Sequence, residues 1–473
     1  MCGDHKPRTK IVARRPKLYL AVVLMTGMHS WPVAAETLNH MLGQAYLFSP
    51  ALKSARDTLD AVNEQRPMAL SSWLPTLSVT GSAATVQNSE PSTPNFSDLA
   101  STHRYTQLGV TSELSWPITQ GGGEFAKLRA ADHMIVAARA NLLSAEQNIL
   151  FTAATAYLDV LTQRAILQAQ VENLEALREI LAVVKQQVAA GDRTLPEQTR
   201  VDLDISEAMA ALIDTRSQVD QALARYEMAT GVPPQGELES PAPISILPPT
   251  LEDALTLALS ANPNVLSSAA MALAARDAVD QAGATLLPSL AFVVSDEHYR
   301  RNYPDSFNGL SGPFRGSSIR LQLTIPLYQG GAEYAAVRQA KKIAYARYYD
   351  GQQAKIDVRS QAQQAWLQRQ NYISQNEFYQ NAVKLSEQLV DQYRRVVAGG
   401  EITIFEALDG YSSRLTAKIQ MLTVVRNRTL ADYALLFASG GLTARSLELD
   451  VPYYDPLGDY SRTKWRIWGL GIE

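Results

Sequence analysis

The stretch TIPLYQGGAEYAAVRQA, Thr324 to Ala340, changes from one kind of secondary structure to another. Apolar and polar residues alternate at 319–325, which is the period-two pattern of a strand with two different faces. After Gly330 and Gly331 the chain is rich in Ala, Lys and Gln and contains no proline for about seventy residues, which favours helix. The same change occurs in SWPITQGGGEFAKLRAA, Ser115 to Ala131. One chain therefore makes the same strand-to-helix joint twice.

Each joint has the pattern Pro-x-x-Gln-Gly-Gly. Pro117 and Pro326 lack an N–H donor, so we expect them to end strand pairing. Glycines permit the sharp change of backbone direction that follows, and they are Gly121, Gly122, Gly330 and Gly331.

The two joints belong to an internal repeat that spans most of the chain. The segment TLNHMLGQAYLFSPAL at 37–52 aligns with TLEDALTLALSANPNV at 250–265, so that Pro50 matches Pro263. From the joints onward the offset between matching residues is 209 and does not change. Pairs at this offset include Gly121/Gly330, Glu124/Glu333, Gly191/Gly400, Thr194/Thr403, Glu197/Glu406 and Gly231/Gly440. Long helices that pack side by side must keep such a register, whereas the halves of a loop-rich enzyme rarely do.

The repeat divides the chain into a signal peptide at 1–35, a first repeat at 36–231, a linker at 232–249, a second repeat at 250–440 and a tail at 441–473. In the first repeat we expect helices at about 37–48, 50–71, 122–190 and 195–230, and strands at about 76–88 and 104–116. In the second we expect helices at about 250–260, 263–286, 331–398 and 402–439, and strands at about 289–301 and 316–327.

The first 35 residues have the features of a cleaved signal peptide. Six basic residues precede an apolar run at 18–28, and Val33-Ala34-Ala35 offers small residues before Glu36. A transmembrane anchor is the alternative, but this run is well short of the ~20 residues that span a bilayer. The only cysteine, Cys2, leaves with this segment, so the exported chain has no disulfide. Its formal net charge goes from −4 to about −9, which argues against nucleic acid as a partner.

The long helices carry apolar residues at spacings of three and four, which is typical of a coiled-coil seam. One run is Leu167, Val171, Leu174, Leu177, Leu181, Val184 and Val188. The core of a soluble helical bundle would show the same spacing. Length favours the coiled coil, because ~69 residues at 1.5 Å each make a helix of roughly 100 Å. The opposite faces are polar, which indicates that these helices stand in water.

The strand expected at 104–116 has an apolar face and a polar face. Leu108, Val110, Leu114 and Trp116 share the first face, and Gln107, Thr111, Glu113 and Ser115 share the second. This alternation fits a barrel wall between lipid and a wet lumen, and it also fits an antiparallel sheet on a soluble core. Four strands cannot close a barrel, so in lipid several chains must complete the wall. Two chains would supply eight strands, and three would supply twelve and leave room for a passage.

Three aromatic residues, Trp73, Trp116 and Tyr328, fall where strands meet helices. At one common level they would form an aromatic girdle at the membrane interface. Single aromatics at strand ends also serve simply as core residues, and that alternative stays open here.

In this combination the chain resembles the TolC-type family of outer-membrane factors, the exit ducts of Gram-negative secretion and drug-efflux machines. The residues that carry the resemblance are the helix starts at Pro50 and Pro263, the Leu-Pro before each first strand, the two joints, and the paired tips at 190–194 and 398–403. The resemblance implies an α+β membrane protein: a homotrimer with a twelve-stranded outer-membrane β-barrel, continued by a long twelve-helix α-barrel across the periplasm. It also implies recruitment by an inner-membrane pump, either an ABC exporter or a proton-driven pump, and by a periplasmic adaptor.

In this family the adaptor contacts the tips of the helix hairpins, and the periplasmic end opens and closes like an iris. The resemblance places the adaptor contacts at Gly191, Asp192, Thr194, Gly399, Gly400 and Thr403. Glycine permits the tight reversal and threonine can N-cap the returning helix, which a helix hairpin without any partner would also need.

The family narrows its pore with acidic rings about one turn past the second tip. Glu406 and Asp409 match these positions on one helix face, and Glu197 is related to Glu406 by the repeat. Such a ring selects for cations and can be plugged by divalent metal, whereas acids near a helix N-terminus are also favoured by the helix dipole alone. Val397 and Ile402 are apolar where relatives carry polar latch residues, so an apolar contact or a looser resting pore is expected.

The tail from Val451 to Glu473 resembles the endings of members that serve type I protein secretion. The resemblance therefore favours export of a protein substrate, with small-molecule efflux as the alternative. The aromatics of the tail would also suit simple packing around the equator of the α-barrel.

We expect neither an enzyme nor a bound cofactor or metal. The histidines of the exported chain, His40, His103, His133 and His298, are too scattered for a metal-ligand motif. No Walker loop, nucleophile elbow or cysteine pair occurs. A trimeric structural or adhesive coiled coil is the competing class, but it would lack the paired strands. An outer-membrane enzyme would need a polar cluster that the sequence does not show.

Overall fold

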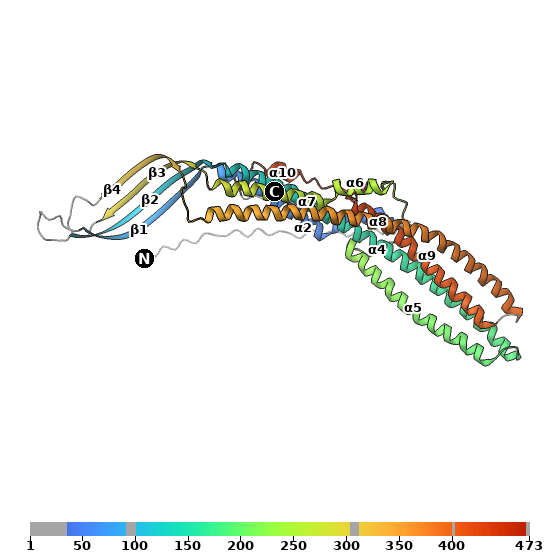
Figure 1. Cartoon of the computed structure of the whole chain (residues 1–473). Coiled ribbons are helices and arrows are strands. Elements are labelled where there is room, and N and C mark those ends of the chain that lie inside the picture. Colours follow the sequence, from blue (N-terminus) through green and yellow to red (C-terminus); the bar gives the residue numbers. More distant parts are fainter. Residues whose placement is uncertain (1–35, 91–100, 303–311, 400–402, 470–473) are drawn as a thin grey trace, which may run out of the picture.

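The computed structural model describes residues 36–90, 101–302, 312–399 and 403–469. It is a long rod with four strands at one end and two helix hairpins at the other (Figure 1). The elements of the first half are α1 (Leu38–Phe48), α2 (Pro50–Asn63), α3 (Gln65–Leu70), η1 (Ser71–Trp73), β1 (Thr76–Glu90), β2 (Ser101–Gln120), α4 (Gly123–Ala190) and α5 (Leu195–Thr230). Those of the second half are α6 (Leu251–Ala261), α7 (Pro263–Ala284), β3 (Ser289–Asn302), β4 (Gly312–Thr324), α8 (Ala332–Gly399), α9 (Ile404–Ala438) and α10 (Gly458–Thr463). The predicted signal peptide lies outside the described residues.

Two helices, α4 and α8, run from the sheet to the tips, where α5 and α9 turn back (Figure 1). Each has 68 residues, which corresponds to about 100 Å. They begin and end within one residue of the expected ranges 122–190 and 331–398. Among the helices of the described segments, none has both the length and the apolar character that crossing a membrane requires.

The helix expected at 50–71 is broken, which corrects that prediction. α2 ends at Asn63, and α3 and the 3₁₀ turn η1 follow as separate pieces. Pro67 explains the break, because a proline ring clashes with the carbonyl four residues before it, here that of Asn63. The break brings Trp73 to the end of η1, just before β1 begins at Thr76.

The four strands form one antiparallel sheet in the order β1-β2-β3-β4. The β2–β3 pairing joins the two halves of the chain, with Thr106 opposite Asn302. β1 and β4 lie at the edges, and within the described chain each pairs on one side only. The sheet therefore ends in two open rows of backbone N–H and C=O groups.

One face of this sheet exposes apolar side chains. Leu77 on β1 and Ile319, Leu321 and Leu323 on β4 are between 60 and 73 % exposed. Cross-strand register places Leu77 opposite Leu114, which continues the apolar face across β2. The side-chain alternation expected from the sequence is thus present on the folded sheet.

β2 continues past Pro117 to Gln120, which corrects the expectation that this proline ends strand pairing. Pro117 lies opposite Ala291, and the register shifts just after it. At a bulge a proline needs no ladder N–H, so the strand bends there instead of ending. In the second half β4 stops at Thr324, two residues before Pro326 and short of the expected 327.

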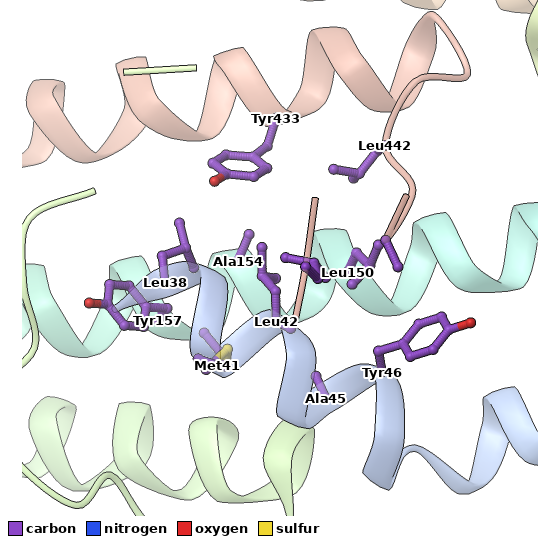
Figure 2. Close-up of a cluster of buried hydrophobic side chains, with 14 of the residues drawn as sticks. Leu38, Met41, Leu42, Ala45, Tyr46, Leu150, Ala154, Tyr157, Tyr433 and Leu442 are labelled. Atoms are coloured by element: carbon purple, nitrogen blue, oxygen red, sulfur yellow. The ribbon is translucent and has the colours of Figure 1, made fainter. Parts of the chain in front are cut away.

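The largest apolar core lies near the middle of the rod, where α1 packs on α4 (Figure 2). Met41, Leu42 and Ala45 of α1 and Leu150 and Ala154 of α4 have no exposed surface. Each large side chain buried in this way stabilises the fold by about 1.5–3 kcal/mol. Residues of α5, α9 and the C-terminal tail complete the cluster, so it ties both ends of the chain to the long helices.

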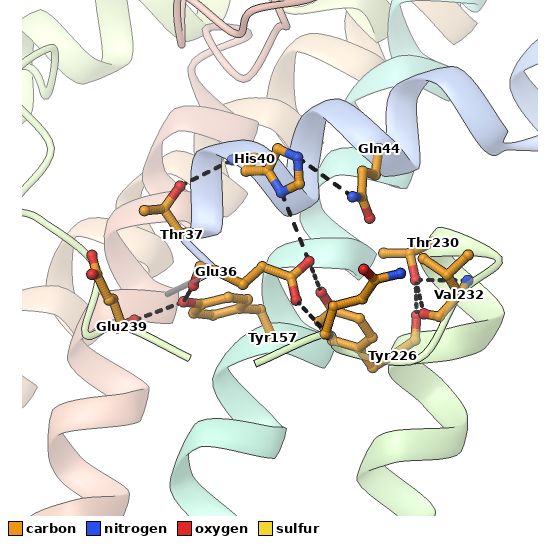
Figure 3. Close-up of polar contacts among 10 residues, drawn as sticks. Glu36, Thr37, His40, Gln44, Tyr157, Tyr226, Thr230, Val232 and Glu239 are labelled. Atoms are coloured by element: carbon orange, nitrogen blue, oxygen red, sulfur yellow. Dashed lines mark hydrogen bonds and ion pairs between the residues drawn. The ribbon is translucent and has the colours of Figure 1, made fainter. Parts of the chain in front are cut away.

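A buried polar network holds Glu36, the residue that the predicted cleavage would leave first (Figure 3). Tyr226 Oη donates to the Glu36 carboxylate at 2.6 Å. The Tyr157 hydroxyl lies 2.7 Å from the carbonyl oxygens of both Glu36 and Glu239. Burial raises the pKa of Tyr157 to about 12, so its hydroxyl stays protonated at neutral pH. The network joins Glu36 to α4, to α5 and to the linker that follows α5.

We expect Tyr226→Phe to lower the free energy of unfolding by about 1–3 kcal/mol, because a buried carboxylate loses its hydroxyl donor while the ring is kept. Glu36 is only 7 % exposed, so water cannot readily replace that donor. Thermal unfolding in detergent measures the change, with Tyr345→Phe as the control because Tyr345 is 62 % exposed. Equal midpoints for the two variants would show that the Tyr226 hydroxyl contributes nothing.

Candidate functional site at the helix tips and joints

At the first tip, α4 ends and α5 begins within five residues. Gly191 has a φ of 86°, and the N–H of Asp192 donates to the carbonyl of Gln187 at 2.9 Å, which closes the end of α4. Thr194 and Glu197 form a capping box, in which the Glu197 carboxylate accepts from the Thr194 N–H at 2.9 Å. The predicted N-cap role of Thr194 is confirmed.

At the second tip, α8 ends at Gly399 and Thr403 caps α9 in the same way. The Glu406 carboxylate accepts from the Thr403 N–H at 3.1 Å and from its hydroxyl at 3.0 Å. The part of the chain that the structure describes does not include Gly400, Ile402 or the side chain of Val397, which belong to the predicted turn and latch. What was expected of them stays a prediction.

The predicted pore acids differ in their surroundings. Arg193 donates to Glu197 at 2.8 Å. The hydrogen bond from the Thr194 N–H, together with Arg193, holds the pKa of Glu197 below its usual range. Glu406 and Asp409 are exposed, and no ion pair involves either of them within the described residues. The charge of Glu197 at the first tip is therefore balanced by a cation. Those of Glu406 and Asp409 at the second tip are not balanced by any cation of the described residues.

One apolar core reaches both tips and includes all four long helices. Val184 of α4, Val390 of α8 and Ile404 of α9 are almost fully buried in it, and α5 contributes to the same cluster. Gly410 of α9 lies so close to the Tyr393 ring that an added Cβ would be 2.7 Å from it. The shared core therefore joins the two hairpins near their tips, and the Gly410 contact closes α8 on α9 within the second hairpin.

Ion pairs also join the α4–α5 hairpin to the α8–α9 hairpin. Lys418 Nζ is 2.6 Å from the Glu172 carboxylate, and Arg426 donates to Asp159 at 2.6 Å. The hydrogen bond from Lys418 lowers the pKa of Glu172, so this pair is charged at neutral pH. These contacts are partly exposed, so each is expected to contribute at most about 1 kcal/mol.

At the other end of the long helices, the joint glycines serve two purposes. Gly121 and Gly122 have φ values of 68° and 82°, in the left-handed region. A Cβ on Gly121 would lie 2.4 Å from the Ala284 carbonyl oxygen, whereas nothing lies within 4 Å of one on Gly122. Gly330 and Gly331 have φ values of 76° and 83° and open space around them. All four glycines thus have a left-handed backbone, which other residues rarely adopt. At Gly121 the neighbouring backbone also leaves no space for a Cβ.

The acid that follows each joint had no role predicted from its position in the sequence. Glu124 is 3 % exposed and accepts from the Gln120 N–H at 3.1 Å. Glu333 is 7 % exposed and accepts from the Gln329 N–H at 3.4 Å. Gln120 is the last residue of β2, whereas Gln329 lies five residues past the end of β4, and in both places the carboxylate gives a partner to a backbone N–H just before a long helix. The signal available in the sequence was that both acids recur at the constant offset of 209.

Comparison with known proteins identifies the family. A sequence profile of the outer membrane efflux protein family matches residues 41–232 and again residues 254–441. The chain belongs to this family. Family membership and similarity to outer-membrane relatives place the protein in the outer membrane, extending into the periplasm.

The chain is similar along nearly its whole length to the outer membrane efflux protein BepC of Brucella suis, with 27% identity over 461 residues and 96% of each chain covered. The alkaline protease secretion protein AprF of Pseudomonas aeruginosa is 24% identical over 313 residues, which are 65% of this chain and 64% of AprF. The CmeC outer membrane channel of Campylobacter jejuni superimposes with a TM-score of 0.74 over 90% of this chain and 89% of CmeC. At 16% identity this last likeness shows the fold alone.

In this outer membrane efflux protein the structure brings two of the predicted girdle residues together. The Trp116 indole N–H donates to the Trp73 carbonyl oxygen at 3.0 Å. The Trp73 ring meets Phe125 edge-on with ring centres 4.8 Å apart. Tyr328 is 77 % exposed beside the second joint. Their contact with a membrane interface stays a prediction.

Gly121→Ala is expected to impair assembly more than Gly122→Ala. Both variants put a non-glycine residue in the left-handed region, at a cost of about 1–2 kcal/mol. Only Gly121→Ala also drives a methyl group against the backbone of α7, at the Ala284 carbonyl. The amount of heat-resistant oligomer in outer-membrane fractions measures the difference. Equal amounts from both variants would contradict the close approach at Gly121.

Proposed function

We propose that three copies of this chain form one duct that carries substrate out of the cell. In this proposal twelve strands make a β-barrel in the outer membrane, and twelve long helices continue it as an α-barrel across the periplasm. An inner-membrane pump and a periplasmic adaptor deliver the substrate to the helix tips. The observation that carries the proposal is a four-stranded sheet with two open edges and an exposed apolar face, joined to helices of about 100 Å.

The number of copies is argued from closure. In lipid the open edges of β1 and β4 would leave backbone groups unsatisfied, at a cost of several kcal/mol each. Pairing β4 of one copy with β1 of the next removes every open edge once the ring closes. Two copies would make an eight-stranded barrel whose interior is filled by side chains, whereas three leave a passage.

The tips are proposed as both the contact for the adaptor and the narrow point of the pore. Gly191, Asp192 and Thr194 are exposed at the first tip, where a partner can reach them. In a trimer the uncompensated Glu406 and Asp409 would contribute six carboxylates around the constriction. Glu197 belongs to the same proposed constriction, with its charge balanced by Arg193.

Opening of the periplasmic end is proposed to separate the two hairpins of each copy. The Lys418–Glu172 and Arg426–Asp159 pairs would break in that movement, and the shared core at the tips would be exposed. Such weak, water-accessible pairs suit a contact that must reopen, because water and salt replace them at little cost.

Protein secretion of the type I kind is the favoured use of the duct. Its support is the tail, which resembles that of secretion members, and the likeness to a relative named as an alkaline protease secretion protein. The alternative is efflux of small molecules, which the likeness to an efflux protein covering 96% of each chain favours.

Deleting the gene is expected to abolish release of a secreted protein into the medium while its synthesis continues. Comparing cell-associated and released protein in the deletion strain, with a complemented strain as the control, tests the proposal. The same strain tested for sensitivity to small toxic compounds distinguishes the two substrate classes. Normal release together with unchanged sensitivity would count against a duct of either kind.

Glu406→Ala combined with Asp409→Ala is expected to weaken block of the channel by multivalent cations, because the ring of carboxylates that binds them is lost. Single-channel recording in a planar bilayer measures the blocking concentration. The control is Glu207→Ala with Asp220→Ala, which removes the same charge from exposed positions of α5 away from the tip. An unchanged blocking concentration in the tip variant would remove these acids from the pore lining.

A further inference from the structure

The tail that follows α9 returns toward the sheet along α2 and α3. Tyr454 Oη donates to Asp60 at 2.9 Å, and farther along the tail Asp459 accepts from Asn63 at 3.0 Å. Arg66 then donates to the Lys464 carbonyl at 3.0 Å. Later tail residues meet later residues of α2 and α3, so the two segments run in the same direction, toward the strands.

Three arginines fix this path by lying over aromatic rings of the tail. The Arg56 guanidinium is 5.1 Å from the ring centre of Tyr454, and that of Arg139 is 4.6 Å from Tyr460. The Arg66 guanidinium lies 4.7 Å from the Trp465 ring and also pairs with Asp132 at 2.9 Å. The aromatics of the tail thus pack against α2, α3 and α4 of the same chain, and this packing holds the tail at a defined height along them.

At its end the tail exposes large apolar side chains next to cationic ones. Trp465, Ile467 and Trp468 are 62 %, 59 % and 92 % exposed. They alternate with Lys464 and Arg466, and residues 461–469 contain no acid. Within the described residues neither of these two cations forms an ion pair. A soluble surface would gain nothing from exposing two tryptophans and an isoleucine.

The height of this segment matches the edge of the membrane. Arg66 is seven residues before Trp73, which is about 10 Å of helix. Trp73 and Trp116 mark the end of the sheet. A head-group layer adds about 5–7 Å beyond the hydrocarbon on each side. Trp468 is three residues past Trp465, so the chain can rise by up to about 10 Å more. Head-group level is therefore within reach of Ile467 and Trp468, whereas Trp465 is held beside Arg66.

We propose that residues 464–468 bind anionic phospholipid in the periplasmic leaflet of the outer membrane. The Trp468 indole and Ile467 enter the head-group layer, and Lys464 and Arg466 pair with lipid phosphates. The tail then acts as a second, peripheral contact with the membrane, outside the strands. This inference rests on the orientation in the proposed function, with the sheet in the membrane.

A neighbouring copy of the chain or the periplasmic adaptor is the other conceivable occupant of this surface. Lipid is favoured because the segment combines tryptophan with cations and has no acid, which is complementary to anionic head groups. Its position also fits lipid, since α10, which directly precedes the segment, lies in the half of the rod that carries the sheet and far from the tips (Figure 1).

Single-tryptophan variants of the mature protein test the proposal in lipid nanodiscs that contain brominated phosphatidylglycerol. One keeps only Trp468, a second only Trp116, and a third only Trp366 in the middle of α8, the other tryptophans being Phe. We expect bromine to quench Trp116 and Trp468 and to leave Trp366 unchanged. Brominated phosphatidylcholine is expected to quench Trp468 less. Heat-resistant oligomer on gels confirms that each variant is assembled.

The outcomes separate this inference from the proposed function. Quenching of Trp116 without Trp468 would overturn the lipid contact and leave the duct intact, whereas loss of both would overturn the orientation itself. Lys464→Glu with Arg466→Glu is expected to abolish the preference of Trp468 for phosphatidylglycerol. The control Lys384→Glu with Arg395→Glu makes the same charge change on α8 toward the tips and should preserve that preference. If the tail variant instead loses its oligomer and the control does not, the surface belongs to a neighbouring subunit.

Discussion

Backbone hydrogen bonding at the open edges of the sheet is the constraint on which the rest of the molecule depends. β1 and β4 each have a free row of N–H and C=O groups, and the apolar face between them has no cover within the described chain. Lipid cannot satisfy such groups, so the sheet needs more copies of itself to be stable there. In the proposed trimer this one requirement accounts for the ring of strands, for the ring of helices that follows it, and for the passage along the axis.

The two ends of the long helices meet different physical demands. At the joints, left-handed glycines turn the backbone, and the buried carboxylates of Glu124 and Glu333 accept backbone N–H groups just before the long helices begin. At the tips, capping boxes begin the returning helices, while the contacts between hairpins are partly exposed ion pairs and a shared apolar core. In the proposed duct the joints lie next to the membrane, and the contacts between hairpins lie at the far end, where the entrance would open.

Much of this architecture was readable from periodicity, because side-chain spacing alone decides helix or strand over long runs. The 68-residue helices and the capping threonines were predicted from the sequence. The effect of single prolines within a helix or strand pattern was harder to predict. Pro67 broke a helix that its apolar pattern favoured, and Pro117 was absorbed in a bulge because β3 continued to pair beyond it. The close contact of Gly410 with Tyr393 depends on how α8 and α9 pack against each other, which the residue pattern of either helix does not specify.

By itself the sequence determined the order and length of the elements, the positions of both joints and both tips, and the alternation that makes one face of the sheet apolar. These are local properties, set by hydrogen bonding and side-chain spacing within a few residues. Only the tertiary structure decided which ion pairs join the two hairpins, how the tail packs along α2 and α3, and where its tryptophans come to lie. Those features depend on distances between segments that are far apart in the sequence, by hundreds of residues in the case of Lys418 and Glu172, and such distances exist only once the chain has packed.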